Sequence, residues 1–273
     1  MGLSSVNTIN IMGAGPELSA GNIALIIGHP GHELRIFRFI EIYKPRVYVL
    51  TDGSGSHGVS RIHNTAAILE KCGATLSPVM GYFTDMELYK ILLQKDYDPL
   101  FRCIDKISYD LQENAVTVIA GDAIEGYNPT HDLCRYMINH LASDLEKRLK
   151  APVKNFDFLL DGLATPGKEK LLEIRLDDAD FERKYKTAES YQELAFEVKR
   201  AVEKYGREPF KIEYLREVNK PYRYNDWEEE IPFYEKYAEE KVASGVYHEV
   251  VSFKEHVLPF LEKLSSYVEL PVF

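Results

Sequence analysis

The stretch NIALIIGHPGHEL, residues 22–34, joins an unbroken apolar run to two histidines and a glutamate. Continuous apolar runs of this kind are typical of strands in a parallel sheet that helices cover on both faces. Pro30 and Gly31 then interrupt the strand and favour a tight turn. Beyond the turn, apolar side chains recur every three residues, which predicts a helix over 33–44 that Pro45 ends. The stretch therefore predicts a strand, a turn that carries histidines, and a helix.

The same alternation continues along the chain. Including the first, four apolar runs predict strands at 22–28, 46–52, 115–122 and 155–162. Apolar spacings of three and four residues predict further helices at 60–72, 98–111 and 131–148. Strands that alternate with helices predict an α/β fold, in the form of a Rossmann-like, doubly wound and mostly parallel sheet with helices on both faces.

The last hundred residues have a different pattern. A long helix is predicted over 179–204 and a final helix near 252–265, and the polar and aromatic stretch 219–237 lies between them. We expect one domain over 1–273, in which residues 1–20 form an arm. In that domain, about 165–273 form a mainly helical extension that packs on the sheet and lines a pocket. The tyrosines in 219–227 suit either stacking on a sugar or packing of this extension.

Bulk properties narrow the classes of function. The chain has 273 residues and a formal net charge of -10, which argues against a nucleic-acid partner because phosphate contacts need clustered Lys and Arg. No apolar run is long enough to span a membrane, and the first residues lack the pattern of a secretory signal. The chain has three cysteines, about thirty residues apart and without a CxxC pair, which suit reduced thiols. We expect a cytoplasmic protein.

Polar residues follow the predicted strands where they end, at His29, Asp52, Asp122 and Asp161. Open α/β sheets bind ligands outside the carboxyl ends of their strands. These side chains should therefore lie along one edge of the sheet, and we expect the functional site there.

Three histidines belong to this edge. His29 and His32 flank the Pro-Gly turn, and a third histidine lies in EGYNPTHD, residues 125–132. Asn128 can cap a helix that begins at Pro129, which puts His131 in its first turn. Three imidazoles that meet at one point predict a tetrahedral zinc site with an open fourth position, with one zinc per chain. On spacing alone, ordinary histidines of turns or of the core remain an alternative.

The order of these motifs resembles the PIG-L/LmbE family of zinc-dependent N-acetylglucosaminyl deacetylases, whose metal motifs have the forms HPDDE and HPDH. The glycine-rich TDGSGSHGVSR, residues 51–61, and KYKTAESYQ, residues 184–192, are similar to later family motifs. The resemblance covers about residues 20–200 in the family's order. It implies a deacetylase of N-acetylated amino sugars, with zinc that polarises the acyl carbonyl and activates the attacking water.

Carried over by position, the resemblance makes His29 the first zinc ligand and His131 the last. His32 occupies the place of a liganding aspartate, and Gly31 occupies the place of the aspartate that acts as general base. Asn128 occupies the place of a histidine that stabilises the oxyanion. A zinc held by three neutral histidines keeps its full charge, so its water ionises with less help from a base.

Other residues are candidates for the missing roles. Asp52 is the favoured base because its strand should neighbour that of His29, and Glu33 is a second candidate that could instead stabilise the first turn of its helix. Asn128 can donate a hydrogen bond to a developing oxyanion. The expected substrate contacts are Arg61, Asp122 and Tyr127, although a surface salt bridge is an equal alternative for Arg61. The other five histidines are interpreted as surface or structural residues: His57, His63, His140, His248 and His256.

The sequence thus predicts a zinc-dependent hydrolase that acts on an N-acylated sugar, a glycoconjugate or a sugar-like small molecule. Two alternatives stay open. One is a metal-binding pseudoenzyme or sugar-binding protein without turnover, which the glycine at position 31 favours. The other is a metal-dependent hydrolase of a different acyl bond, such as an ester. We expect a small-molecule partner, no membrane insertion and, as a possibility, a homo-oligomer.

Overall fold

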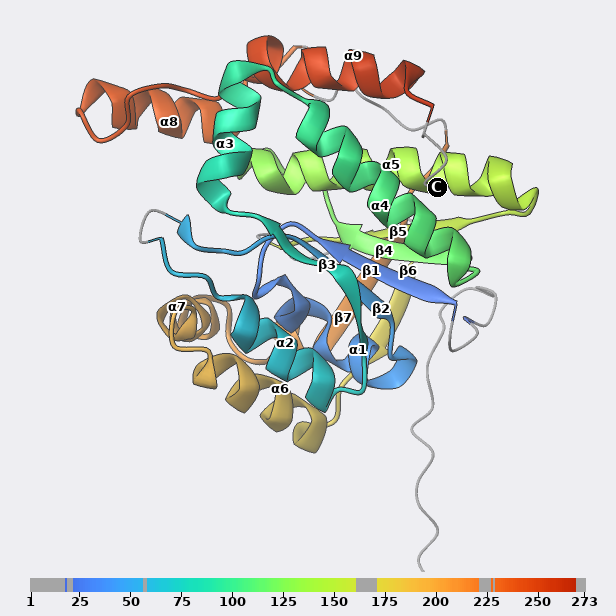
Figure 1. Ribbon diagram of the computed structural model, residues 1–273. Coiled ribbons are helices and arrows are strands. Elements are labelled where there is room, and N and C mark those ends of the chain that lie inside the picture. The colour runs from blue at the N-terminus through green and yellow to red at the C-terminus, as the bar shows by residue number, and fades with distance from the viewer. Residues whose placement is uncertain are drawn as a thin grey trace, which may run out of the picture.

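A twisted sheet runs through the middle of the protein, with helices packed on both faces, in the computed structural model (Figure 1). The structure describes residue 18 and residues 22–55, 58–160, 171–220, 227 and 229–268. The strands are β1 (Ile23–Ile27), β2 (Arg46–Thr51), β3 (Thr75–Phe83), β4 (Val118–Asp122), β5 (Lys154–Phe158), β6 (Leu171–Arg175) and β7 (Ile212–Glu217). Their order across the sheet is β3-β2-β1-β4-β5-β7-β6. The first five are mutually parallel, and β7 is antiparallel to both β5 and β6.

The predicted α/β fold with a mostly parallel sheet is confirmed, and each of the four predicted strands is present. Prediction missed β3, β6 and β7. β3 contains Pro78 and Gly81, two residues that weaken a strand pattern. A proline is tolerated there because β3 lies at the edge of the sheet, where an amide donor is not required on the open side.

The helical elements surround this sheet. They are η1 (His32–Ile36), α1 (Phe37–Tyr43), α2 (Ile62–Lys71), α3 (Asp85–Gln94), α4 (Asp98–Glu113), α5 (Pro129–Leu149), α6 (Asp178–Ser190), α7 (Ala195–Tyr205), η3 (Glu208–Lys211), α8 (Phe233–Ala243), η4 (Phe253–Val257) and α9 (Leu258–Ser266). The single helix predicted over 179–204 is wrong, because the structure has α6 and α7 with a corner between them. Tyr191 adopts an extended conformation at this corner, and its ring is buried in the apolar core that also contains residues of β1, α1 and α2.

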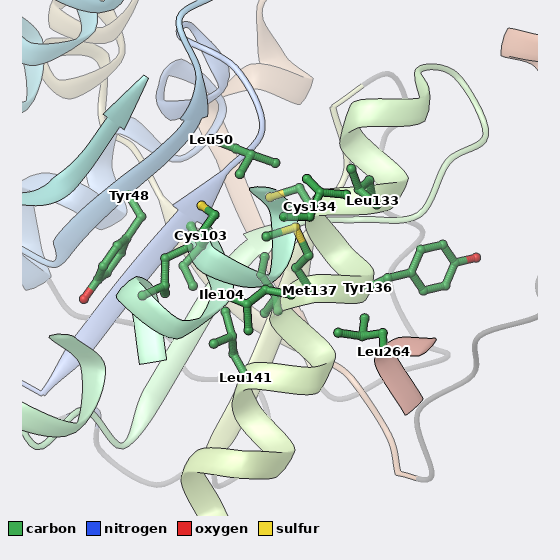
Figure 2. Packing of buried hydrophobic residues seen from close by; sticks show 14 of the residues in the cluster. Tyr48, Leu50, Cys103, Ile104, Leu133, Cys134, Tyr136, Met137, Leu141 and Leu264 are labelled. Atoms are coloured by element: carbon green, nitrogen blue, oxygen red, sulfur yellow. The ribbon is translucent and has the colours of Figure 1, made fainter. Parts of the chain in front are cut away.

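Two apolar cores lie on the two faces of the sheet, because successive side chains of a strand point to opposite faces. Ala24 and Ile26 of β1 belong to the core under α3, α4, α5 and α9, whereas Leu25 and Ile27 belong to the core under α1, α2 and α6. Figure 2 shows the first of these cores, with the sulfur atoms of its cysteines among apolar side chains. The three cysteines are buried and unbonded, as expected for reduced thiols. In the part of the chain described, none of the helices has the length and apolar character needed to cross a bilayer.

The strand order reverses at β1. β2 and β3 follow on one side of β1, whereas β4 and β5 lie on its other side. The loops that leave β1 and β4 therefore diverge at their carboxyl ends, and a crevice at such a point is the usual ligand site of an open α/β sheet. The histidines of residues 29–32 and 131 follow these two strands.

A buried arginine ties α5 to the sheet beneath this point. Arg135 is 1% exposed, and its guanidinium donates to the side-chain oxygen of Asn155 at 2.7 Å and to the carbonyl of Phe156 at 2.9 Å. Its Nε donates to the carbonyl oxygen of Asp122. One side chain thus links the end of β4 and the middle of β5 to the helix that carries His131.

Replacing Arg135 by methionine should lower the free energy of unfolding by about 3 kcal/mol, because buried acceptors on β4 and β5 lose their donors. Arg148 is a matched control on the same helix, exposed and paired with Asp144. Arg148→Met should cost less than about 1 kcal/mol. Urea unfolding followed by circular dichroism measures both variants, and equal losses would contradict the assigned role of Arg135.

Candidate metal centre

The three predicted histidines come together at the reversal point of the sheet. His29 and His32 lie in the turn after β1, and His131 lies in the first turn of α5. Their ring centroids are 5.4 Å apart for His29 and His32, 5.1 Å for His29 and His131, and 4.5 Å for His32 and His131. Residues from opposite sides of the reversal point thus form one cluster of imidazoles.

The Nδ1 atom of His29 faces oxygen atoms on neighbouring elements. It lies 2.6 Å from Oγ1 of Thr51 and 3.2 Å from Oδ1 of Asp85. Because the Thr51 hydroxyl donates to the carbonyl of Gly28, it accepts from the imidazole. We infer that Nδ1 of His29 carries the proton, which leaves the lone pair on Nε2.

His32 is oriented in the same way by Asp122. Its Nδ1 lies 3.0 and 2.9 Å from the two carboxylate oxygens of Asp122, so this nitrogen also carries the proton. Oδ2 of Asp122 accepts a second hydrogen bond, of 2.7 Å, from the backbone amide of Gly28. Histidines that bind metals are held in this manner, with one ring nitrogen on a carboxylate, carbonyl or water and the other free for the metal.

Two nitrogens of the cluster have no hydrogen-bond partner among the described residues. They are Nε2 of His29 and Nδ1 of His131, and both are buried. Burial lowers the pKa of His131 well below its usual range, and the neighbouring His32 and His29 lower it further. A neutral imidazole presents a lone pair, so the orphaned nitrogens suit a cation.

The spacing of the rings agrees with one zinc ion. Three imidazoles bound tetrahedrally with Zn–N distances of about 2.0–2.1 Å have ring centroids roughly 5 Å apart. In their present orientations, no three His, Cys, Asp or Glu side chains of the described ranges have donor atoms placed to hold an ion. Rotation about χ2, a torsion with a broad distribution in histidine, turns the ring nitrogens without moving the ring to another place. Ring positions, orphaned nitrogens and supporting carboxylates fit zinc.

Glu33 is held inside the protein. Its side chain is completely buried, Oε2 accepts from the amide of Gly31 at 2.8 Å, and Oε1 accepts from the hydroxyl of Thr65 at 2.7 Å. Burial raises the pKa of Glu33, while these hydrogen bonds act in the opposite direction. These contacts make Glu33 an anchor of the turn that follows β1, which it joins to Thr65 of α2.

Asp52 and Asn128 lie beside the two strands that carry the histidines. Asp52 directly follows β2, which pairs with β1 as predicted, and its Oδ1 accepts from the amide of Ser54 at 3.0 Å. Asn128 caps α5 as predicted, with Oδ1 accepting from the amide of Thr130 at 2.8 Å. The side-chain NH₂ group of Asn128 donates a hydrogen bond to none of the described residues, so its two N–H groups stay available.

The three expected substrate contacts have different surroundings. Asp122 is fully buried, and its carboxylate binds His32 and Gly28. Nε of Arg61 donates to the carbonyl of Gly53 at 2.5 Å, so this arginine holds the glycine-rich loop. The Tyr127 ring is 52% exposed.

Sequence reasoning missed Thr51 and Asp85, the partners of His29. Asp85 is the first residue of α3, and because β3 was not predicted, nothing placed α3 at this edge. The signal was present: Thr84 and Glu87 form a capping box, which marks the start of a helix. Burial tends to raise the pKa of Asp85, but the contacts with His29 and with the amide of Gly55 hold it far below its usual range.

The remaining histidines lie on other elements. His63 is exposed on α2, His140 is buried on α5, and Nδ1 of His256 accepts from the amide of Ser252 at 3.0 Å. His248 is exposed and precedes η4. His57 and Asp161 lie outside the described residues.

Gly31 has a backbone conformation that other residues rarely adopt. Its φ is +106°, and a Cβ atom at this position would lie 2.3 Å from Cδ1 of Leu194. Leu194 belongs to the corner between α6 and α7, which packs on the histidine turn at this point. A side chain here would be strained and would also displace Leu194. The glycine is therefore required by the local structure, whatever its place in the chemistry.

Comparison with known proteins gives weak likenesses. No protein-family model matches the sequence, and no curated protein matches it. The fold is similar to the zinc-inhibited form of teicoplanin deacetylase Orf2, with 10% identity, a TM-score of 0.42, and coverage of 72% of this chain and 99% of that chain. It is also similar to the conserved protein TT1542 from Thermus thermophilus, with 16% identity, a TM-score of 0.44, and coverage of 76% of this chain and 98% of that chain. No family membership follows at these values.

The wild-type protein should bind one zinc ion per chain, and His29→Ala and His131→Ala should abolish stoichiometric binding because each removes a ligand. His63→Ala is the matched control, since this histidine is exposed on α2. Elemental analysis after removal of free zinc measures the stoichiometry, and thermal unfolding should show a zinc-dependent rise in Tm for wild type and control only. Equal zinc in all four proteins would refute the assigned ligands.

Gly31→Ala should lower the free energy of unfolding by about 1–2 kcal/mol through its positive φ, with a further loss from the Leu194 contact. Gly58→Ala separates the two effects, because Gly58 has a φ of +68° and a Cβ atom added there would meet nothing within 4 Å. Chemical denaturation of both variants, repeated in a Leu194→Ala background, isolates the contact. A Gly31→Ala protein as stable as the wild type would show that the turn does not depend on glycine.

Proposed function

We propose that the protein is a zinc-dependent hydrolase that removes an acetyl or similar acyl group from an N-acylated amino sugar or sugar-like small molecule. One observation carries the proposal: three imidazoles meet at the ligand edge of the sheet, and two of their buried nitrogens have no partner among the described residues. Three protein ligands and an open position are the usual arrangement of a catalytic zinc. The order of the sequence motifs supports the class of substrate.

In this proposal His29, His32 and His131 hold the zinc. When bound, zinc supplies a Lewis acid that polarises a carbonyl group and lowers the pKa of water. The chain's own contribution is to bring three imidazoles together and to hold the Nδ1 atoms of His29 and His32 on oxygen acceptors, which leaves their Nε2 lone pairs for the ion. Asp122 secures this state of His32, and Thr51 and Asp85 secure that of His29.

The carboxylates around the histidines also set the charge of the site. Asp122 and Asp85 contact two different histidines and lie on two different elements, β4 and α3. Neither aspartate is a proposed ligand. A histidine side chain would therefore lie between each negative charge and the ion. The ligands remain neutral, which favours electrophilic behaviour of the ion, while the nearby carboxylates compensate for burying a cation.

Proton transfer is assigned to Asp52. The position where the resemblance places a base is Gly31, whose φ and contact with Leu194 disfavour any side chain. Glu33 is already engaged by Gly31 and Thr65. Asp52 follows the strand beside β1, and a carboxylate in this place can accept a proton from the attacking water and return it to the leaving amine. We assign the side-chain amide of Asn128 as a donor to the substrate's carbonyl oxygen.

The substrate is expected to enter along the loops that surround the histidines. Arg61 shapes the wall formed by the glycine-rich loop through its bond to Gly53. Tyr127 offers an exposed ring on the loop before α5. These residues suit a polar ring with an apolar face, as a sugar has. The expected partner is a small molecule.

Gly31 specifically favours one alternative, a metal-binding or sugar-binding protein without turnover, because it removes a carboxylate from the turn between two proposed ligands. The alternatives separate in one assay. Zinc-loaded protein that binds N-acetylated sugars and releases no acetate would support the binding protein. Release of acetate from esters and not from amides would support hydrolysis of another acyl bond.

Asp52→Asn should lower kcat for release of acetate from N-acetylated amino sugars by about 10²–10⁴-fold, with unchanged zinc content, because the general base is lost. Glu33→Gln should mainly lower stability, since an amide NH₂ would then face the donors of Gly31 or Thr65. Acetate release and urea unfolding of both variants are the measurements. A larger loss of kcat in Glu33→Gln, with intact stability and zinc, would assign the base to Glu33.

A further inference from the structure

Three exposed aromatic rings form a row that begins at the loop before α5. The rings of Tyr127 and Phe233 are stacked, with centroids 5.5 Å apart and planes at 8°. Phe233 stacks in turn on Tyr237, at 5.9 Å and 26°. The three residues are 52%, 53% and 41% exposed. Tyr127, Phe233 and Tyr237 are called the aromatic platform below.

The platform is fixed to the loop that leads to His131. The amide of Tyr234, in the first turn of α8, donates to the carbonyl of Gly126 at 2.9 Å. Trp227 lies against the same glycine, because a Cβ atom on Gly126 would be 2.5 Å from its ring, and the indole Nε1 donates to Asp132 at 2.9 Å. Asp132 also accepts from the amide of Gly126, at 3.1 Å. These bonds join α8 to the start of α5.

The platform begins, along the chain, beside the candidate metal centre. Tyr127 directly precedes Asn128, the cap of α5, and the amide of His131 donates to the carbonyl of Asn128 at 3.1 Å. In Figure 1, α8 projects beyond the end of the sheet on the side of α3 and α5. We take Tyr127 as the link through which a molecule bound at the histidines would reach α8.

The chemistry of the platform selects one kind of occupant. Its rings are about half exposed: they stack on one another, and Nζ of Lys241 lies 5.0 Å from the centroid of Tyr237. A group bound on the remaining exposed surface keeps one face hydrated. A sugar ring suits this surface, because its C–H face can stack on an aromatic ring while its hydroxyl groups stay in water. An acyl chain needs an enclosing pocket, since it is apolar all round. The hydroxyl groups of the two tyrosines add polar atoms at the rim.

We propose that the aromatic platform of Tyr127, Phe233 and Tyr237 is a saccharide subsite that binds the sugar residue next to the one held at the metal centre. The inference rests on the proposed function insofar as it takes the substrate to be a sugar, and it makes that substrate an oligosaccharide or a glycoside with a second ring. The platform binds and positions this ring. It takes no part in the bond that breaks.

Titration calorimetry of the zinc-loaded full chain with N-acetylglucosamine and its β-1,4-linked dimer and trimer tests the subsite. The dimer should bind about tenfold more tightly than the monomer, an increment typical of a stacked ring. Phe233→Ala and Tyr237→Ala should remove most of this increment and leave monomer affinity unchanged. Fluorescence of Trp227, the only tryptophan in the chain, should respond to the dimer because its indole lies under the same loop.

Two variants make the test specific. Tyr237→Phe keeps the ring and should keep the preference for the dimer. Tyr109 is a control outside the platform: it is 48% exposed and lies near the end of α4 that leads to the start of β4. Tyr109→Ala should also keep the preference for the dimer. Circular dichroism and thermal unfolding confirm that the variants are folded, which is expected because the rings replaced are exposed.

Failure of the subsite and failure of the proposed hydrolysis have different signatures. Acetate release combined with equal affinity for monomer and dimer would overturn the subsite and leave the hydrolase intact. A dimer preference that Phe233→Ala removes, without acetate release, would support the subsite and refute hydrolysis. A dimer preference that survives in both alanine variants would overturn the platform as its cause.

Discussion

The carboxylate of Asp122 is the point on which the site depends. It lies at the end of β4, fully buried, and binds both the amide of Gly28 and the imidazole of His32. Its backbone carbonyl accepts from Arg135, which carries the connection to α5. One residue thus joins the end of β1, the histidine turn and the helix that holds His131. A buried carboxylate is stable only with such partners, so the site and the sheet support each other.

The C-terminal half closes the site from two directions. On one face of the sheet, the corner between α6 and α7 presses Leu194 onto Gly31, which restricts the turn between His29 and His32. On the other face, Trp227 and the first turn of α8 hold the loop before His131. The loops at the reversal of strand order are therefore contacted by segments that follow the parallel strands in sequence. The contacts of Leu194 with Gly31 and of Trp227 with Asp132 fix the backbone of the two loops that carry the histidines, which the local sequence does not determine.

The polar surroundings explain how three imidazoles can share one cluster inside the protein. Burial lowers the pKa of His131, while Thr51 and Asp85 face Nδ1 of His29 and Asp122 faces Nδ1 of His32. The buried nitrogens of His29 and His131 then lack partners among the described residues, a cost that a cation would remove. The positive φ of Gly31 and the nearby Leu194 side chain disfavour a larger residue in the turn between His29 and His32.

The sequence by itself determined the α/β fold, its four central strands and the capping of α5 by Asn128, because these follow from local apolar periodicity and from side-chain hydrogen bonds within one turn. It also indicated that His29, His32 and His131 share an edge, since parallel strands end together. Only the tertiary structure decided that Asp85 supports His29, that Glu33 is buried under the turn and that Phe233 joins Tyr127. These pairings join segments that are far apart in the chain. β3 contains a proline and a glycine, and the helix predicted over 179–204 breaks at Tyr191. Both features depend on packing against neighbouring elements, which no local sequence pattern encodes.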